Sequence, residues 1–289
     1  MRSKIGISTW SLQQLSYTEG KKIEDLISIV ADMGVDGIDI CEEYIPCHPN
    51  PDILELRRIK KLVERNNLQI GASWFCSEIL CGIHAGSEEQ VLNVYRRNII
   101  IASEMGAKFI CVPMLLNVQG MTIPEATNMF IHFFEKLLPF AEQYNMPIAH
   151  EVPREHTPEI ALNVHKALQS EYYTICPDLE TWRLDTADMP LGPHCENKDA
   201  KKPQPASIEL FNECLPYSPY IHFKLLSFDE QGEEPHFPIP EIMKGINNSG
   251  IEHYLCIEYE GWIPDFHPER DPIEETRKCV DLIRRYQKK

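Results

Sequence analysis

Short apolar runs alternate with longer segments of helical period along the whole chain. Eight of the runs are β-rich and lack full polar alternation, as parallel strands covered on both faces do. They span residues 4–9, 37–41, 69–75, 108–114, 147–152, 172–178, 220–226 and 254–260. Between them, apolar residues recur at helical spacing in 22–34, 51–67, 87–106, 124–145, 157–168, 240–250 and 271–287.

Eight strands that alternate with helices predict a closed (β/α)8 TIM barrel of the α/β class. The alternative, an open doubly wound sheet, normally carries a Gly-rich phosphate loop after its first strand, and STWSLQQLSY at that place has none. No linker rich in Gly or Ser divides the chain, so we expect one domain over 1–289. The long irregular segment 182–206 follows the sixth strand, on the face where barrel enzymes keep their active sites.

Composition and charge narrow the function classes. The formal net charge of −16 repels phosphate backbones and anionic membranes, which argues against a nucleic-acid partner. No stretch approaches the roughly 18 apolar residues of a membrane span. The ten cysteines include no CxxC pair, and Cys111, Cys176 and Cys256 lie in strand-like runs where a free thiol acts as a small hydrophobe. Because the N-terminus also lacks a signal-peptide pattern, we expect a reducing, cytoplasmic compartment.

Four successive strands carry ionisable groups at their carboxyl ends, where barrels place their chemistry. Taken alone, a Glu there is more often an ion-pair partner, and a His can be a core residue. An unpaired buried carboxylate is very costly, however, so several that converge predict a shared cation. Three carboxylates and one imidazole suit Mn²⁺, Mg²⁺, Co²⁺ or Zn²⁺. The predicted ligands of this one divalent metal ion are Glu151, Asp178, His222 and Glu258.

These strand ends resemble the xylose isomerase-like TIM-barrel superfamily of sugar isomerases and epimerases. The matching motifs are Glu151 in AHEVP, Asp178 in CPDLETW, His222 in IHFK and Glu258 in IEYEGW. The resemblance implies an enzyme with one divalent metal ion, Mn²⁺ foremost, acting on a small sugar or keto-sugar by removing a proton next to a carbonyl. Two histidines common in the family are replaced here by Pro153 and Thr181, which argues against an ordinary ketose epimerase.

A narrower resemblance gives the main alternative. The run from IHFKLLSFDEQGEEP to CIEYEGW is similar to the catalytic α subunits of C-glycoside deglycosidases. That similarity implies a carbon–carbon lyase of 3-oxo-glycosides that works with a small β subunit. An endonuclease-IV-like repair enzyme would need about three metals, more His ligands and a basic groove, which the acidic charge disfavours. A non-catalytic binding barrel is a fourth reading, and an intact ligand set argues against it.

The predicted chemistry assigns roles to individual side chains. A bound cation chelates adjacent oxygens of a hydroxyketone and stabilises an enediolate as a C–H proton is lost. We expect Glu151 and Glu258 to act from opposite sides, one removing the proton and the other returning it. Lys224, on the same side of its strand as His222, is either a donor to a developing oxyanion or an ion-pair partner. By alternation His150 points away from the barrel interior, and we expect it to be structural.

Further candidates lie near the predicted mouth of the barrel. The aromatic candidates are Trp10, Trp74 and Phe75, which either form an apolar wall against a sugar face or pack the barrel. The candidates for binding hydroxyl or phosphate groups of a substrate are Arg154, His156 and Arg183. We expect His84 and His194, which lie in loops, to be solvent-exposed. Glu260 shares the parity of Glu258 and is expected to support it from outside the ligand set. The helices 87–106 and 124–145 are compatible with a homo-oligomer.

Overall fold

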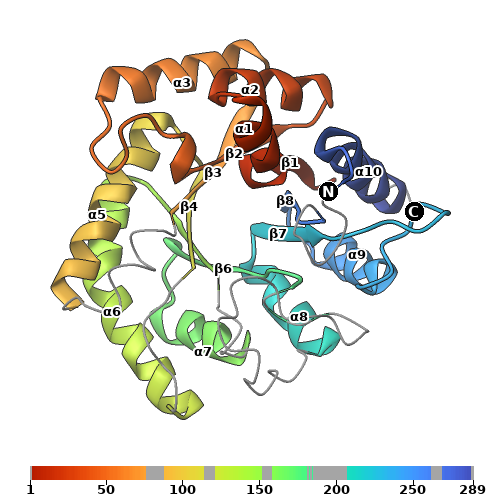
Figure 1. Cartoon of the computed structure of the whole chain (residues 1–289). Coiled ribbons are helices and arrows are strands. Elements are labelled where there is room, and N and C mark those ends of the chain that lie inside the picture. The colour runs from red at the N-terminus through yellow and green to blue at the C-terminus, as the bar shows by residue number, and fades with distance from the viewer. Residues whose placement is uncertain are drawn as a thin grey trace.

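A computed structural model of the chain describes residues 2–75, 88–113, 121–151, 158–180, 182, 184, 207–261 and 269–287. Its eight parallel strands form one sheet in the order β6-β5-β4-β3-β2-β1-β8-β7, with the helices around the outside (Figure 1). Between β6 and β7 the ring closes through a bridge of Asp178 with His222, and the His222 amide donates to the carbonyl of Pro177 at 2.9 Å. The predicted (β/α)8 barrel is therefore confirmed.

All eight predicted strands are present, each inside the run that predicted it. They are β1 (Lys4–Ser8), β2 (Gly37–Cys41), β3 (Gln69–Trp74), β4 (Phe109–Pro113), β5 (Ile148–Glu151), β6 (Tyr173–Cys176), β7 (Tyr220–Leu225) and β8 (Tyr254–Tyr259). Every pairing between neighbours is parallel, so their carboxyl ends meet at one end of the barrel. That end is where the sequence places its ionisable groups.

The seven predicted helices are also present. They are α2 (Ile23–Asp32), α3 (Ile53–Arg65), α5 (Glu88–Met105), α6 (Ile123–Gln143), α7 (Pro158–Leu168), α9 (Ile239–Asn248) and α10 (Pro272–Gln287). The pattern did not predict the short helices α1 (Gln13–Glu19) and α8 (Ile208–Cys214), because seven residues are too few for a clear apolar stripe. Most of the irregular segment 182–206 lies outside the described residues. Within the described ranges, no helix combines the length and apolar character that a bilayer crossing needs.

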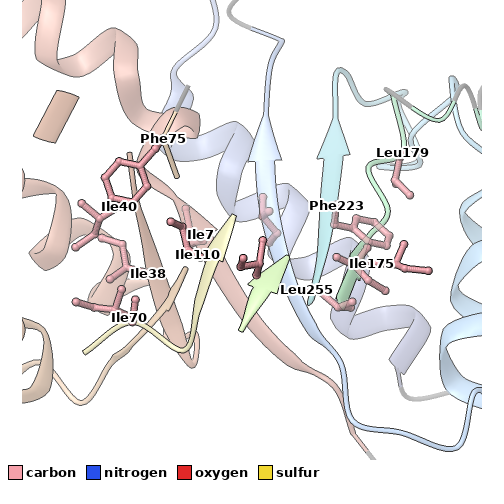
Figure 2. Close-up of a cluster of buried hydrophobic side chains, with 14 of the residues drawn as sticks. Ile7, Ile38, Ile40, Ile70, Phe75, Ile110, Ile175, Leu179, Phe223 and Leu255 are labelled. Atoms are coloured by element: carbon pink, nitrogen blue, oxygen red, sulfur yellow. The ribbon is translucent and has the colours of Figure 1, made fainter. Parts of the chain in front are cut away.

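Most of the hydrophobic burial lies between the strands and the helices. Outward-facing side chains of the strands form this layer, and Figure 2 shows part of it, including Ile7, Ile38, Ile70 and Ile110. Each of these isoleucines is at most 3% exposed, and burying one stabilises the fold by roughly 1.5–3 kcal/mol. This layer holds the strands in register, so the residues at their ends keep fixed positions.

The barrel interior is filled differently, by two tyrosines among small side chains. Tyr220 and Tyr254 stack with their ring centroids 5.8 Å apart and their planes 11° apart. Tyr254 occupies the space over Gly6 and Gly71, where an added Cβ would approach its ring to within 2.2 Å. The small neighbours are Ala72, Cys111, Ala149, Cys176 and Cys256. These three cysteines are buried free thiols, as predicted, while the cellular compartment stays a prediction.

Candidate metal centre

Three of the four predicted ligands, Glu151, Asp178 and His222, have ligand atoms that all lie within 4.8 Å of one another, and Glu258 approaches the same histidine. Nδ1 of His222 lies 3.4 Å from Glu151 Oε2, 3.7 Å from Asp178 Oδ2 and 3.8 Å from Glu258 Oε2. All four residues are at most 5% exposed. Within the described part of the chain, His222 Nδ1 makes no hydrogen bond of good geometry. A buried nitrogen and three carboxylate oxygens that face one another in this way form a suitable environment for a cation.

Local backbone geometry aims these side chains. Glu151 is the last residue of β5, and Glu258 lies on β8 in register with Lys224 of β7. Asp178 follows β6, and its Oδ1 accepts the amide N–H of Glu180 at 2.8 Å. This turn is common for Asp, because its side chain can replace a backbone acceptor. It holds the carboxylate so that Oδ2 faces His222.

Lys224 lies beside the ligands and is surrounded by acid groups. Its Nζ is 3.3 Å from Asp178 Oδ2 and 3.7 Å from Glu258 Oε2. The same nitrogen lies 3.4 Å from Glu180 Oε2 and 3.2 Å from Glu260 Oε1. Of the two predicted roles, the ion pair is therefore visible in the structure. Donation to an oxyanion stays a prediction.

The charge balance of this cluster tests whether a metal ion fits. Among the described residues, five buried carboxyl groups lie around Lys224 and His222, and they are Glu151, Asp178, Glu180, Glu258 and Glu260. Buried charge is tolerated only when it is paired, so the excess of acid groups favours a divalent cation. Three carboxylates with one imidazole are a donor set for Mn²⁺, Mg²⁺, Co²⁺ or Zn²⁺. Glu151, Asp178 and His222 therefore fit the predicted ion, and Glu258, 3.8 Å from Nδ1 of His222, stays the predicted fourth ligand.

The surroundings push the pKa values of the two ligand glutamates apart. Burial opposes ionisation of Glu151, but the charges of His222 and Lys224 outweigh it and lower its pKa to about 2. Burial dominates at Glu258 and raises its pKa to about 7, although the same two cations favour its charged form. Burial likewise disfavours the imidazolium of His222, yet its pKa is raised well above the usual range by the carboxylates, Glu258 foremost. In the metal-free protein, Glu151 is thus ionised at neutral pH, whereas Glu258 titrates close to neutral pH.

This split predicts how Glu258 affects stability against pH. In the metal-free protein, Glu258 titrates near 4.5 when unfolded and at about 7 when folded. The folded state binds the extra proton, so the stabilisation is complete below the lower pKa and is lost as pH rises through the upper one. The loss amounts to about 3 kcal/mol. In thermal melts with a chelator, the stability of Glu258→Gln relative to the wild type should increase from about pH 5 to about pH 8. A stability difference that does not change with pH would contradict this assignment.

The predicted aromatic wall is present in part. Trp10 and Trp74 are half-buried, with ring centroids 5.7 Å apart and planes tilted by 52°. Trp10 Nε1 donates to Glu260 Oε1 at 2.9 Å, which ties the wall to the acid group that contacts Lys224. Phe75 is fully buried in the outer core, so barrel packing explains it. The two tryptophans stay candidates for contact with a substrate.

Other predicted positions separate into a confirmed one and untested ones. His150 points outward as expected, with Nδ1 2.6 Å from the hydroxyl of Tyr173 and its ring 5.2 Å from those of Phe130 and Phe134 of α6. It is a core residue. The charged candidates for substrate binding, Arg154, His156 and Arg183, lie outside the described residues. So do the two departures from the family motifs, Pro153 and Thr181. The same holds for His84 and His194.

Sequence reasoning missed a polar network directly below His222. Tyr220 donates from its hydroxyl to Oδ2 of Asp39 on β2, and Tyr254 donates to Oδ1 at 2.8 Å. The Tyr220 hydroxyl also lies 2.8 Å from Nε2 of His222. Burial raises the pKa of Asp39, while the hydroxyls of both tyrosines act to lower it. The signals were an acid inside the apolar run GIDIC and a tyrosine two residues before His222, on the same side of β7.

A second missed pair lies after β2, at the same end of the barrel. Glu42 is buried and His48 is half-buried, with Nδ1 of His48 3.8 Å from Oε2 of Glu42. The His48 ring lies 5.6 Å from that of Phe75, which follows β3. Nothing in the local pattern distinguishes these two residues from ordinary loop residues. Their burial depends on the packing of β2 against β3.

The fold and the cluster together define the class. A (β/α)8 barrel with its acid and histidine groups at the carboxyl ends of β5 to β8 has the architecture of barrel enzymes. The chain belongs to the xylose isomerase-like TIM barrel family, whose model matches residues 27–285. The resemblance noted from the strand-end motifs is therefore confirmed.

Known proteins share the fold over nearly the whole chain. The 3-keto-D-glucoside 4-epimerase from E. coli superposes with a TM-score of 0.67 at 14% identity, covering 98% of this chain and 100% of that one. The IOLI protein, solved with a zinc atom, superposes with a TM-score of 0.70 at 13% identity, covering 98% and 99%. At these identities the likeness shows the fold alone.

A curated relative matches the sequence over about a quarter of the chain. The C-glycoside deglycosidase alpha subunit of Arthrobacter globiformis is 33% identical over 73 residues, which are 25% of this chain. The match spans 19% of that relative, about a fifth of its length. The narrower resemblance is thus present but covers a minor part of both proteins.

Proposed function

We propose that the chain is a divalent-metal-dependent enzyme that acts on a sugar or keto-sugar derivative by removing a proton next to a carbonyl. The observation that carries this proposal is the buried convergence of Glu151, Asp178 and Glu258 on Nδ1 of His222. A divalent ion held there, with Mn²⁺ our first expectation, would supply a Lewis acid for carbonyl and hydroxyl oxygens. The zinc atom of the IOLI protein supports a divalent ion in this fold.

The protein groups divide the proton transfer between them. Glu151, whose ionised form is favoured by His222 and Lys224, is the proposed base that accepts the proton. Glu258, on β8 beside the same histidine, is the proposed acid that returns one. Lys224, whose Nζ lies 3.7 Å from Glu258 Oε2, is the proposed donor to the oxygen where charge develops. Trp10 and Trp74 would cover the apolar face of the sugar ring.

A sugar oxidised at carbon 3 is the substrate class that we favour. The E. coli protein of the same fold is named for a 3-keto-D-glucoside. A carbonyl at C3 acidifies the C–H bonds at C2 and C4. Loss of the C4 proton and its return on the other face gives an epimer, with Glu151 and Glu258 as base and acid.

The alternative function begins with the same step at the other carbon. Loss of the C2 proton leaves its electron pair to form the C2 enolate. Those electrons then expel the C1 substituent, whose carbon takes the bonding pair and a proton. This is the elimination of a C-glycoside lyase, favoured by the match to the Arthrobacter globiformis alpha subunit. In that case we expect a small β subunit as partner, whereas a homo-oligomer stays compatible with either function.

Solvent exchange tests the proposal and separates the two reactions. The chain is incubated with Mn²⁺ in deuterium oxide with a panel of ketoses and 3-oxo-glycosides, and deuterium is located by NMR. Exchange at C4 with the glycosidic bond intact identifies an epimerase, and exchange at C2 with release of the aglycone identifies the lyase. Both should disappear in a chelator. If the metal-loaded chain exchanges no carbon-bound proton in any of these compounds, the proposal is wrong.

A further inference from the structure

The network below His222 has a defined direction of hydrogen bonding. Asp39 accepts from two tyrosines, with Oδ2 bound by Tyr220 and Oδ1 bound by Tyr254. A tyrosine hydroxyl has one proton to donate, and that of Tyr220 goes to Asp39. Its oxygen can therefore only accept from Nε2 of His222, which lies 2.8 Å away.

This direction determines which nitrogen of His222 carries hydrogen. With Nε2 held as an N–H donor, the lone pair of a neutral imidazole is on Nδ1. Nδ1 is the nitrogen that faces the carboxylates of Glu151, Asp178 and Glu258. Groups that accept a hydrogen bond from the other ring nitrogen of a metal-binding histidine orient its ring and raise its basicity. The network is completely enclosed, since Asp39, Tyr220 and His222 are each at most 1% exposed.

We propose that Tyr220, held by Asp39, is a positioning residue that keeps His222 protonated on Nε2 and presents Nδ1 to the metal ion. This inference rests on the proposed metal centre, since it assigns the ligand atom of His222. It links β2, across the barrel, to a ligand on β7. It also gives the acid in the second strand a role that no strand-end motif would reveal.

Tyr254 provides a matched control for this role. Both tyrosines are buried, stack on each other and donate to the same carboxylate. Only Tyr220, however, also has a bond from its hydroxyl to His222 in the described structure. Removing either hydroxyl takes one hydrogen bond from Asp39, whereas removing that of Tyr220 also releases Nε2.

The test is a calorimetric titration of Mn²⁺ into the metal-free full chain for the wild type, Tyr220→Phe and Tyr254→Phe. We expect Tyr220→Phe to weaken binding by about 10–100-fold and Tyr254→Phe by less than about threefold. Asp39→Asn is a second route to the same change. Its amide can donate to the Tyr220 oxygen, which frees the hydroxyl to donate to Nε2, so metal affinity should fall again. Nitrogen-15 spectra of the zinc-loaded wild type should show hydrogen on Nε2 of His222.

The outcomes separate this inference from the function on which it rests. If the wild type binds metal and the two phenylalanine variants bind it with equal affinity, the positioning role is wrong and the metal centre is unaffected. A wild type that binds none of Mn²⁺, Mg²⁺, Co²⁺ and Zn²⁺ would refute the metal centre itself. Should Tyr220→Phe fail to fold, Asp39→Asn and the location of the His222 proton decide the question.

Discussion

Replacing Glu151 by glutamine should lower the rate of deuterium exchange into substrate by about a thousandfold. Glutamine keeps the size of the side chain but cannot accept a proton as a carboxylate does. His222 and Lys224 stabilise the ionised form of Glu151 despite its burial. The glutamine variant therefore removes the proposed base. The measurement is exchange at the reacting carbon by NMR, with the metal content of each preparation determined beside it.

Glu258→Gln should behave differently at equal metal occupancy. If Glu258 returns the proton, exchange from the first step continues at a reduced rate while product formation stops. Glu252→Gln is the surface control, because Glu252 is exposed and pairs with Lys4 before β8, at the other end of the barrel. Full turnover by metal-loaded Glu151→Gln would contradict its role as the base.

Chelation of the metal should lower the thermal midpoint by roughly 5–10 °C. Free metal at about 100 times its dissociation constant stabilises the folded state by about 2.7 kcal/mol, and each kcal/mol moves the midpoint of a chain of this size by about 2–4 °C. Without the cation, the acid groups around His222 and Lys224 repel one another. Calorimetric melts with and without Mn²⁺ measure the effect.

Asp178 and Glu180 offer a matched pair for that experiment. Both are buried and both approach Lys224, but only Asp178 faces Nδ1 of His222. Asp178→Asn should abolish the metal-dependent rise in the midpoint, whereas Glu180→Gln should retain it. Equal loss in the two variants would show that general negative charge, rather than a ligand set, causes the stabilisation.

The barrel could be predicted from the sequence because its strands are buried on both faces. That burial makes runs such as YIHFKLL and YLCIEYE continuous enough to recognise, and the helices between them have long apolar stripes. Helix α8 escaped prediction because it has seven residues and follows the irregular segment 182–206. Short elements of this kind are held by tertiary contacts rather than by their own pattern.

The site could be predicted only along each strand. Alternation places Glu151, His222 and Glu258 inside the barrel, and their common position at strand ends predicts that they meet. Contacts across the barrel could not be predicted in this way. The alternation of side chains along a strand shows which of them point inward, but not which opposite strand a long side chain contacts. The side chain of Tyr220, for example, extends from β7 across the barrel and bonds Asp39 of β2. Of the four acid groups around Lys224, Asp178 and Glu180 likewise reach it through the closure of β6 against β7.

Anomalous X-ray diffraction from crystals grown with Mn²⁺ tests the central claim most directly. Data collected at the manganese absorption edge locate the ion independently of any assumed ligands. The metal centre predicts one strong peak per chain, within bonding distance of Glu151, Asp178, Glu258 and Nδ1 of His222. Diffraction that shows no peak there, with Lys224 still paired to the carboxylates, would contradict it.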